Sequence, residues 1–139
     1  MTREYIDLVN GIIPNDLGRI NAPIGRDPID RMKMAVVKDG KEAVTNFKVI
    51  KRFKDKTLVS CRLETGRTHQ IRVHFKYIGF PLIGDPLYGT RKVVGDNGQF
   101  LHAYKLGFIH PRTNEYLEFK TELPDYYKKY IEELENEMK

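Results

Sequence analysis

The sequence predicts a strand-rich α+β domain, on the strength of two hairpin patterns and two helical patterns. Residues 43–53 and 57–63 are rich in Val, Thr, Ile and Phe and are separated by a short polar turn; residues 101–109 and 115–120 repeat this arrangement. Helical signals occupy residues 69–78, approximately, and the stretch from Pro124 onward. At 139 residues the chain fits one domain.

Shorter strands and a loop are expected before the first hairpin. Residues 4–9 alternate in polarity and lead to Gly11, and residues 20–24 favour a second short strand. Residues 25–33 are polar and contain Pro28, which predicts a charged loop. Long charged loops often carry function, although an ordinary solvated loop explains the pattern equally well.

The first helix has recognisable ends. Ile71, Phe75 and Ile78 recur at helical spacing, Thr68 suits the N-cap, and Gly79 suits the position just past the C-cap. A strand is the weaker alternative for this stretch.

The closing helix is amphipathic. Pro124 suits its first position. Five residues at three- and four-residue steps form the apolar face that should contact the core: Tyr127, Tyr130, Ile131, Leu134 and Met138.

The charge of the chain favours a polyanionic partner. The net charge of +5 comes from 24 Lys and Arg against 19 Asp and Glu, and the excess lies between Arg3 and Lys92, whereas the tail is acidic. A polyanion such as RNA should therefore contact the body of the domain.

The sequence favours a cytoplasmic location. No apolar run approaches the ~20 residues of a membrane span, and charged residues near the start disfavour a secretory signal. Cys61 is the sole cysteine, which agrees with a reducing compartment.

Common catalytic signatures are missing from the sequence. There is no GxSxG, Walker or GxGxxG motif, and no HExxH-type pair. His69 and His74 are five residues apart and point in different directions on a helix or a strand, so no metal site is expected. Arg67 and Arg72, around a tight turn and a helix start, suit an anion. They could equally be solvated residues of an amphipathic helix.

The stretch Gly66-Arg-Thr-His-Gln-Ile-Arg-Val-His74, followed by Gly84-Asp-Pro-Leu-Tyr-Gly89, resembles the paired motifs of RluA-type (large ribosomal subunit) pseudouridine synthases. Tyr5 to Gly11, the segment from Pro23 to Met34, residues 40–45, Leu101-His-Ala103 and His110-Pro111 also follow the order of that family. The resemblance implies a mixed, mainly antiparallel sheet with flanking helices. It also implies isomerisation of uridine to pseudouridine in RNA, without a cofactor, on a base flipped out of its stack.

The resemblance assigns roles to individual residues. An aspartate of the family attacks the nucleotide, and Arg72 matches the arginine that pairs with it. Tyr5 matches the tyrosine that lies against the uracil and assists proton removal from C5; without the resemblance, a core tyrosine is the simpler interpretation. Arg3 stands where the family usually has lysine, and Asp7 where it usually has alanine. Asp85 is expected to brace its turn.

RNA contacts are predicted from the charged loop to the second motif. The predicted set is Arg26, Arg31, Lys33, Arg67, His69, Gln70, Arg91 and Lys92. Ribosomal RNA is the expected partner, and transfer RNA is the alternative. The competing hypothesis is a noncatalytic RNA-binding module that uses the same cations.

The family's His-Arg-Leu-Asp motif should lie well before the tyrosine, but four residues precede Tyr5 and no equivalent occurs elsewhere. We therefore expect residues 1–139 to be the C-terminal part of a synthase catalytic domain, inactive alone because the part with the nucleophilic aspartate is absent. A sheet deprived of strands would also expose an edge and favour self-association.

Overall fold

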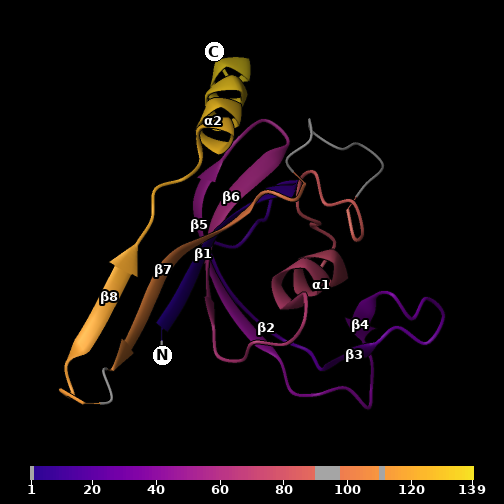
Figure 1. Cartoon of the computed structure of the whole chain (residues 1–139). Coiled ribbons are helices and arrows are strands. Elements are labelled where there is room, and N and C mark those ends of the chain that lie inside the picture. The colour runs from indigo at the N-terminus through magenta and orange to yellow at the C-terminus, as the bar shows by residue number, and fades with distance from the viewer. Residues whose placement is uncertain (1, 90–97, 110–111) are drawn as a thin grey trace.

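The computed structural model describes residues 2–89, 98–109 and 112–139. Its centre is an antiparallel sheet with the strand order β2-β5-β6-β1-β7-β8 (Figure 1). The strands are β1 (Thr2–Asn10), β2 (Leu17–Asn21), β5 (Val44–Arg52), β6 (Lys56–Leu63), β7 (Leu101–Ile109) and β8 (Tyr116–Lys120). A separate two-stranded sheet joins β3 (Ile24–Arg26) to β4 (Met34–Val36). The expected α+β class with a mainly antiparallel sheet is confirmed, and all pairings of the named strands are antiparallel.

Strand β1 lies inside the sheet, between β6 and β7. Its register places Tyr5 opposite Cys61 of β6 and opposite Ala103 of β7, with an irregularity between Glu4 and Tyr5 on the β7 side. Because successive side chains of a strand point to opposite faces, Tyr5, Asp7 and Val9 share one face. This pattern fixes Tyr5 on the face that also carries α1.

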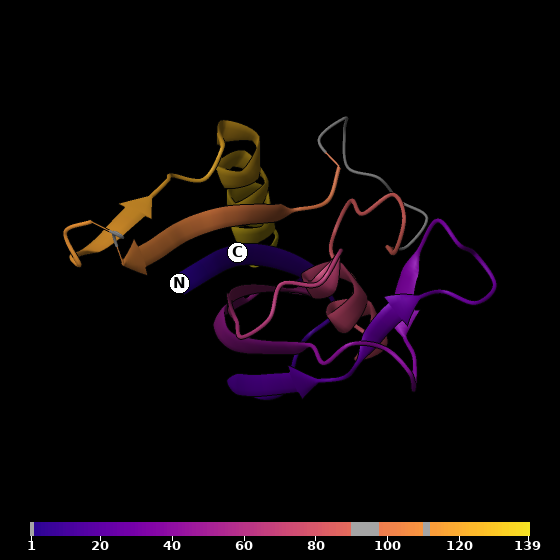
Figure 2. The same ribbon diagram turned by 60° about the horizontal axis from the view of Figure 1, so that its bottom comes forward.

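The two faces of the sheet bury two different cores. Val9, Val59 and Phe75 belong to the core beneath α1 (Gln70–Tyr77). Ile6, Leu8 and other residues of the opposite face form the core beneath α2 (Asp125–Glu137), which contains the fully buried Tyr127. Figure 2 shows the two helices on opposite sides of β1. Burial of these apolar side chains, worth about 25 cal/mol per Å², stabilises the assembly of sheet and helices.

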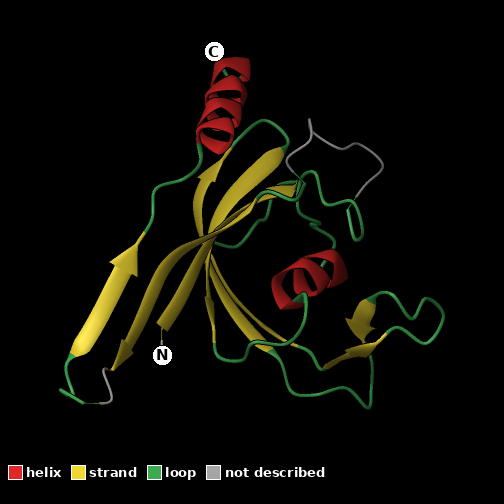
Figure 3. Cartoon of the chain, viewed as in Figure 1, coloured by secondary structure: helices red, strands yellow, loops and turns green. Residues whose placement is uncertain are grey.

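Both predicted hairpins are confirmed, as β5–β6 and β7–β8. The predicted strand over 20–24 is wrong, because β2 ends at Asn21 and β3 starts at Ile24 in a different sheet. Pro23 lies at this break, and a residue without an N–H cannot donate to a ladder. The charged loop predicted over 25–33 is confirmed for residues 27–33, which connect β3 to β4, whereas Gly25 and Arg26 belong to β3. The short strand β4 was not predicted (Figure 3).

The helices begin slightly later than predicted. The N-cap of α1 is His69, in the left-handed region at φ 56°, and no side chain caps it, so Thr68 is not the cap. Gly79 follows the helix at φ 91°, as predicted. In α2, Pro124 is the N-cap and not the first helical residue.

The apolar face of α2 is mostly as expected. Tyr127 and Leu134 are buried, and Tyr130 and Ile131 pack against the same core, but Met138, the C-cap residue, is 54% exposed. Neither helix that the structure describes is long and apolar enough to cross a membrane.

Candidate active site

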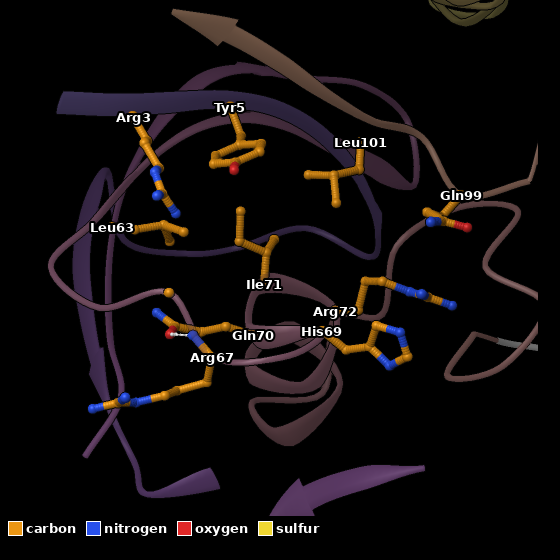
Figure 4. A pocket seen from close by; sticks show the side chains of 11 residues that line it. Arg3, Tyr5, Leu63, Arg67, His69, Gln70, Ile71, Arg72, Gln99 and Leu101 are labelled. Carbon is orange, nitrogen blue, oxygen red and sulfur yellow. Dashed lines mark hydrogen bonds between the residues drawn. The ribbon is translucent and has the colours of Figure 1, made fainter. Parts of the chain in front are cut away.

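A cavity of about 300 Å³ opens between β1, the turn before α1 and the start of β7 (Figure 4). Tyr5 and Arg72, the two residues predicted to act in catalysis, both line it. The other lining residues are Arg3, Leu63, Gly66, Arg67, His69, Gln70, Ile71, Gln99 and Leu101. The cavity size lies at the lower end of small-ligand pockets.

Tyr5 is held in the sheet and not in a loop. Its ring packs against the core beneath α1, close to Ile71 and Leu101 in Figure 4, and forms one wall of the cavity. A ladder residue flanked by two paired strands has little freedom to move, so the ring offers a fixed surface. Its flat face is suited to stacking on a base.

Arg72 makes a two-point ion pair with Asp85. Arg72 Nε donates to Asp85 Oδ2 at 2.9 Å, and Arg72 Nη2 donates to Asp85 Oδ1 at 2.8 Å. The Arg72 side chain is 11% exposed and that of Asp85 is fully buried. This geometry is the strong, directional form of the arginine–carboxylate contact. Within the described residues, the carboxylate that pairs with Arg72 is therefore Asp85.

Asp85 also braces its own turn, as predicted. Its Oδ1 accepts hydrogen bonds from the backbone amides of Leu87 and Tyr88, both at 3.0 Å. Burial alone would raise the pKa of Asp85, but the hydrogen bonds from Arg72 and from the two amides outweigh it, so the pKa lies below the ordinary range. Asp85 is thus ionised and holds the guanidinium in one orientation.

Tyr88 was not predicted as a site residue, yet it links three parts of the site. Its ring lies against the Arg72 guanidinium, with the Cζ atom 5.0 Å from the ring centroid. Its hydroxyl accepts a hydrogen bond from the amide of Met34 at 2.8 Å and lies 2.8 Å from His69 Nδ1. The only sequence signal for a contact between Tyr88 and Arg72 was that they belong to two motifs that occur together.

His69 is partly buried beside these groups. Its burial, followed by the positive charge of Arg72, lowers its pKa, so the ring is neutral at pH 7. It lines the cavity at the side opposite Tyr5 in Figure 4. A neutral imidazole at this place can contact RNA through hydrogen bonds and not through charge.

Gln70 has a different role from the predicted RNA contact. Its side chain is buried and accepts hydrogen bonds from Thr65 Oγ1 at 2.7 Å and from the Arg67 amide at 3.0 Å. Its amide group donates to Val44 O and to Thr45 Oγ1, both at 3.0 Å. Because its oxygen and nitrogen both have partners inside the protein, Gln70 braces the turn, and we do not carry it forward as an RNA contact.

Two of the predicted RNA-binding cations, Arg26 and Arg67, line a second, polar cavity of about 530 Å³. Arg26 of β3, Lys41 and Arg67 line it, and the Arg67 side chain is fixed by donation from Nε to Glu42 O at 2.7 Å. Gly66 and Arg67 line both cavities, so the two are adjacent. Lys41 was missed because nothing in its sequence context distinguishes it from other surface lysines.

The other four predicted RNA-binding cations do not line either cavity in the part of the chain that the structure describes. Arg31 and Lys33 belong to the β3–β4 loop and line neither cavity. Arg91 and Lys92 fall outside the described residues.

Comparison with known proteins identifies the family of the chain. The model of the RNA pseudouridylate synthase family matches residues 1–77. An uncharacterised RNA pseudouridine synthase of Bacillus subtilis, YlyB, is 61% identical over 134 residues, which is 96% of this chain and 44% of that protein. Ribosomal large subunit pseudouridine synthase D of Neisseria meningitidis serogroup A is 48% identical, over 88% of this chain and 36% of that protein. The chain thus spans less than half the length of these curated relatives.

Solved structures resemble the fold. Human RNA pseudouridylate synthase domain containing 1 superposes with a TM-score of 0.77 at 28% identity, covering 88% of this chain and 55% of the other. Human RNA pseudouridylate synthase domain containing 4 gives a TM-score of 0.76 at 21% identity, which supports the fold alone. Because the family model matches more than half of the chain, the chain belongs to the RNA pseudouridylate synthase family.

Proposed function

We propose that this chain provides the tyrosine and arginine of the active site of an RNA pseudouridine synthase, which isomerises uridine without a cofactor. One observation carries this proposal: Tyr5 and Arg72, far apart in sequence, line the same cavity in a chain of this family. Ribosomal RNA is the proposed substrate, because curated relatives are named for the large ribosomal subunit. Transfer RNA is the alternative, and the cytoplasm is the proposed location.

Tyr5 is proposed to contact the flipped uracil. A cavity of about 300 Å³ is large enough for a single base. The Tyr5 ring would stack on the base, and its hydroxyl would help to remove the proton from C5 of the rotated uracil. Rigid placement within the sheet favours both roles, since proton transfer requires hydrogen-bonding distance.

Arg72 is proposed to orient the nucleophilic aspartate. Asp85 takes up two of the five N–H donors of the guanidinium, so three can serve a second carboxylate. Because Asp85 already shares the positive charge, Arg72 would contribute orientation more than charge neutralisation. No His-Arg-Leu-Asp motif occurs in the 139 residues, so the second carboxylate would come from another segment.

The adjoining polar cavity is proposed to hold the RNA backbone. Arg26, Lys41 and Arg67 place three cations beside it, with Asp39 as the acidic residue. Each phosphate contact should contribute about 0.7 to the salt slope for a single-stranded segment. Affinity for an RNA stem-loop should therefore fall as the salt concentration rises.

A segment exchange tests the enzyme proposal. This chain would replace the matching segment of the Bacillus subtilis relative, and pseudouridine would be mapped in ribosomal RNA incubated with the chimera. We expect modification by the chimera, and losses of about 100-fold or more in the Tyr5→Phe and Arg72→Lys variants. Arg19→Gln, in an exposed ion pair with Glu64, is the control. Full activity of both site variants would overturn the assigned roles.

A noncatalytic RNA-binding module is the second candidate. The observation that favours it is the Arg72–Asp85 pair, which satisfies the arginine without any further carboxylate. This candidate predicts salt-dependent RNA binding by the chain and an inactive chimera. An active chimera would exclude it.

A further inference from the structure

The loop between β3 and β4, residues 27–33, is held by its own hydrogen bonds. Asp27 N donates to Lys33 O and Lys33 N donates to Asp30 O, both at 3.0 Å. Asp27 Oδ1 accepts from the amides of Ile29 and Asp30 at 2.8 and 3.1 Å, and Asp30 Oδ1 accepts from the amide of Met32 at 3.1 Å. Both carboxylates are thus turned onto the loop backbone. The loop has a defined shape before any ligand arrives.

This shape holds two apolar side chains out in solvent. Ile29 is 94% exposed and Met32 is 80% exposed, the two highest values among the large apolar residues of the described chain. Single exposed apolar residues are common on protein surfaces and need no explanation. Here two of them lie on one loop with internal hydrogen bonds, residues 27–33, which we call the β3–β4 tip.

Three basic residues lie in the β3–β4 tip or at its base. Arg26 Nη1 donates to Arg31 O at 3.1 Å, and Lys33 closes the loop. The two acidic residues of the loop, Asp27 and Asp30, accept hydrogen bonds from its own amides. An apolar point between guanidinium and ammonium groups complements a ligand with anionic edges and an apolar interior. The phosphates and stacked bases of a nucleic acid have this chemistry.

The tip is tied to the active-site cavity. At the base of the hairpin, the Met34 amide donates to the Tyr88 hydroxyl, and Tyr88 in turn contacts His69 and Arg72. The hairpin and the Gly66–Arg67 turn enclose the polar cavity, and that turn also lines the Tyr5 cavity. Figure 2 shows the hairpin beside α1 on the face that carries the site. The tip is therefore held at a fixed distance from the two cavities, so RNA bound in them would also contact the tip.

We propose that Ile29 and Met32 act as a wedge that enters an interrupted base stack of the RNA, while Arg26, Arg31 and Lys33 hold the phosphates on either side. This inference rests on the proposed function, since flipping a uridine leaves a gap in the stack beside it. An inserted apolar side chain covers base faces that would otherwise be exposed to water. The tip thus selects RNA at a point where stacking is already broken.

The test compares two RNA stems, one continuous and one with a single bulged uridine, binding to the 139-residue chain. We expect the bulged stem to bind about tenfold more tightly, the scale of base-stacking contacts. The double variant Ile29→Ser/Met32→Ser should lose most of this preference while its salt slope stays unchanged. The control Ile50→Ser/Met138→Ser removes two exposed apolar side chains elsewhere and should keep the preference.

A charge variant separates the two parts of the proposal. Arg31→Gln should weaken binding to both stems and reduce the salt slope by about 0.7 to 0.9, with the preference unchanged. Urea unfolding of every variant verifies that the fold is intact.

The results distinguish a failure of the wedge proposal from a failure of the proposed function. If the unaltered chain binds neither stem, the proposed function fails. If it binds both with salt-dependent affinity but shows no preference, or if the double variant keeps the preference, the wedge alone is overturned. Loss of binding to phosphatidylserine vesicles in the double variant, with the RNA preference retained, would assign the tip to a membrane surface and also overturn the wedge.

Discussion

The buried thiol of Cys61 donates a hydrogen bond to Asp7, with Sγ 2.7 Å from Oδ2. Asp7 is fully buried, two residues from Tyr5 on the same face of β1, and its Oδ1 has no hydrogen-bond partner among the described residues. Burial raises the pKa of Asp7 from 3.8 to about 8, although the hydrogen bond from Cys61 lowers it somewhat. A neutral carboxyl group therefore lies beneath the wall of the cavity lined by Tyr5 and Arg72 at pH 7.

This carboxyl group predicts a stability that declines with rising pH. The pKa of Asp7 is higher in the folded state than in the unfolded chain, so its stabilising effect is complete below about pH 4 and is lost as the pH rises towards about 8. The slope is at most about 1.4 kcal/mol per pH unit. Asp7→Asn keeps the shape and removes the titration. We expect its free energy of unfolding to lose this decline between pH 5 and 8, as measured by urea denaturation. The lowered pKa values of His69 and His74 give a slope of the opposite sign, which remains in Asp7→Asn.

A carboxylate with a lowered pKa serves as the control for the pH dependence of stability. Glu64, beside Arg19, titrates below this pH range in both folded and unfolded states. Removing it with Glu64→Gln should leave the slope between pH 5 and 8 in place. An equal slope in the protein and in Asp7→Asn would show that Asp7 is ionised in the fold.

The Arg72–Asp85 pair predicts a large loss of stability when one partner is removed. Asp85→Asn retains an oxygen for the turn amides but leaves the mostly buried guanidinium without its counter-charge. Breaking such a pair costs about 3–5 kcal/mol. The exposed Arg19–Glu64 pair is the matched control, and Arg19→Gln should leave the free energy of unfolding nearly unchanged, because an exposed ion pair contributes little to stability. Equal losses for Asp85→Asn and Arg19→Gln in urea unfolding would contradict this assignment.

The fold could be predicted where the pattern was local. The β5–β6 and β7–β8 hairpins follow from alternating strand formers around a polar turn, and Gly79 follows from the need for positive φ after a helix. The break at Pro23 and the three-residue β4 were missed because they depend on which sheet the chain joins. The left-handed His69 was missed because residues other than glycine rarely adopt that conformation.

The site could be predicted as a set of residues but not as a set of contacts. The family resemblance assigned Tyr5 and Arg72 to one site, and both residues line the same cavity. The sequence did not show that Asp85 pairs with Arg72 or that Tyr88 joins the β3–β4 hairpin to it, since these contacts depend on tertiary structure. Gln70 was predicted as an RNA contact because it is a polar residue in a basic motif, and such residues are usually exposed. In the structure its side chain is buried and forms hydrogen bonds within the protein.

The bracing role of Gln70 predicts a structural loss. Gln70→Leu leaves the buried Val44 carbonyl and Thr45 hydroxyl each without one partner, which should cost about 2–3 kcal/mol of unfolding free energy. Gln99, in the same cavity lining, is the control, and Gln99→Leu should change stability by less than about 0.5 kcal/mol. A stable Gln70→Leu protein with weakened RNA binding would restore the original prediction.

Self-association is predicted at β2, one edge of the central sheet. The other edge, β8, carries Glu118 and Lys120 in ion pairs, and charged side chains discourage strand addition. Strand β2 also carries a charged residue, Arg19, which pairs with Glu64. It presents Leu17 as well, which is 68% exposed, next to a groove lined partly by apolar residues, among them the exposed Tyr77. We expect a dimer by light scattering. Leu17→Lys should shift it to the monomer because a lysine on the edge opposes pairing, whereas Tyr116→Lys on β8 should leave the dimer intact. A monomer for the unaltered chain would exclude this interface.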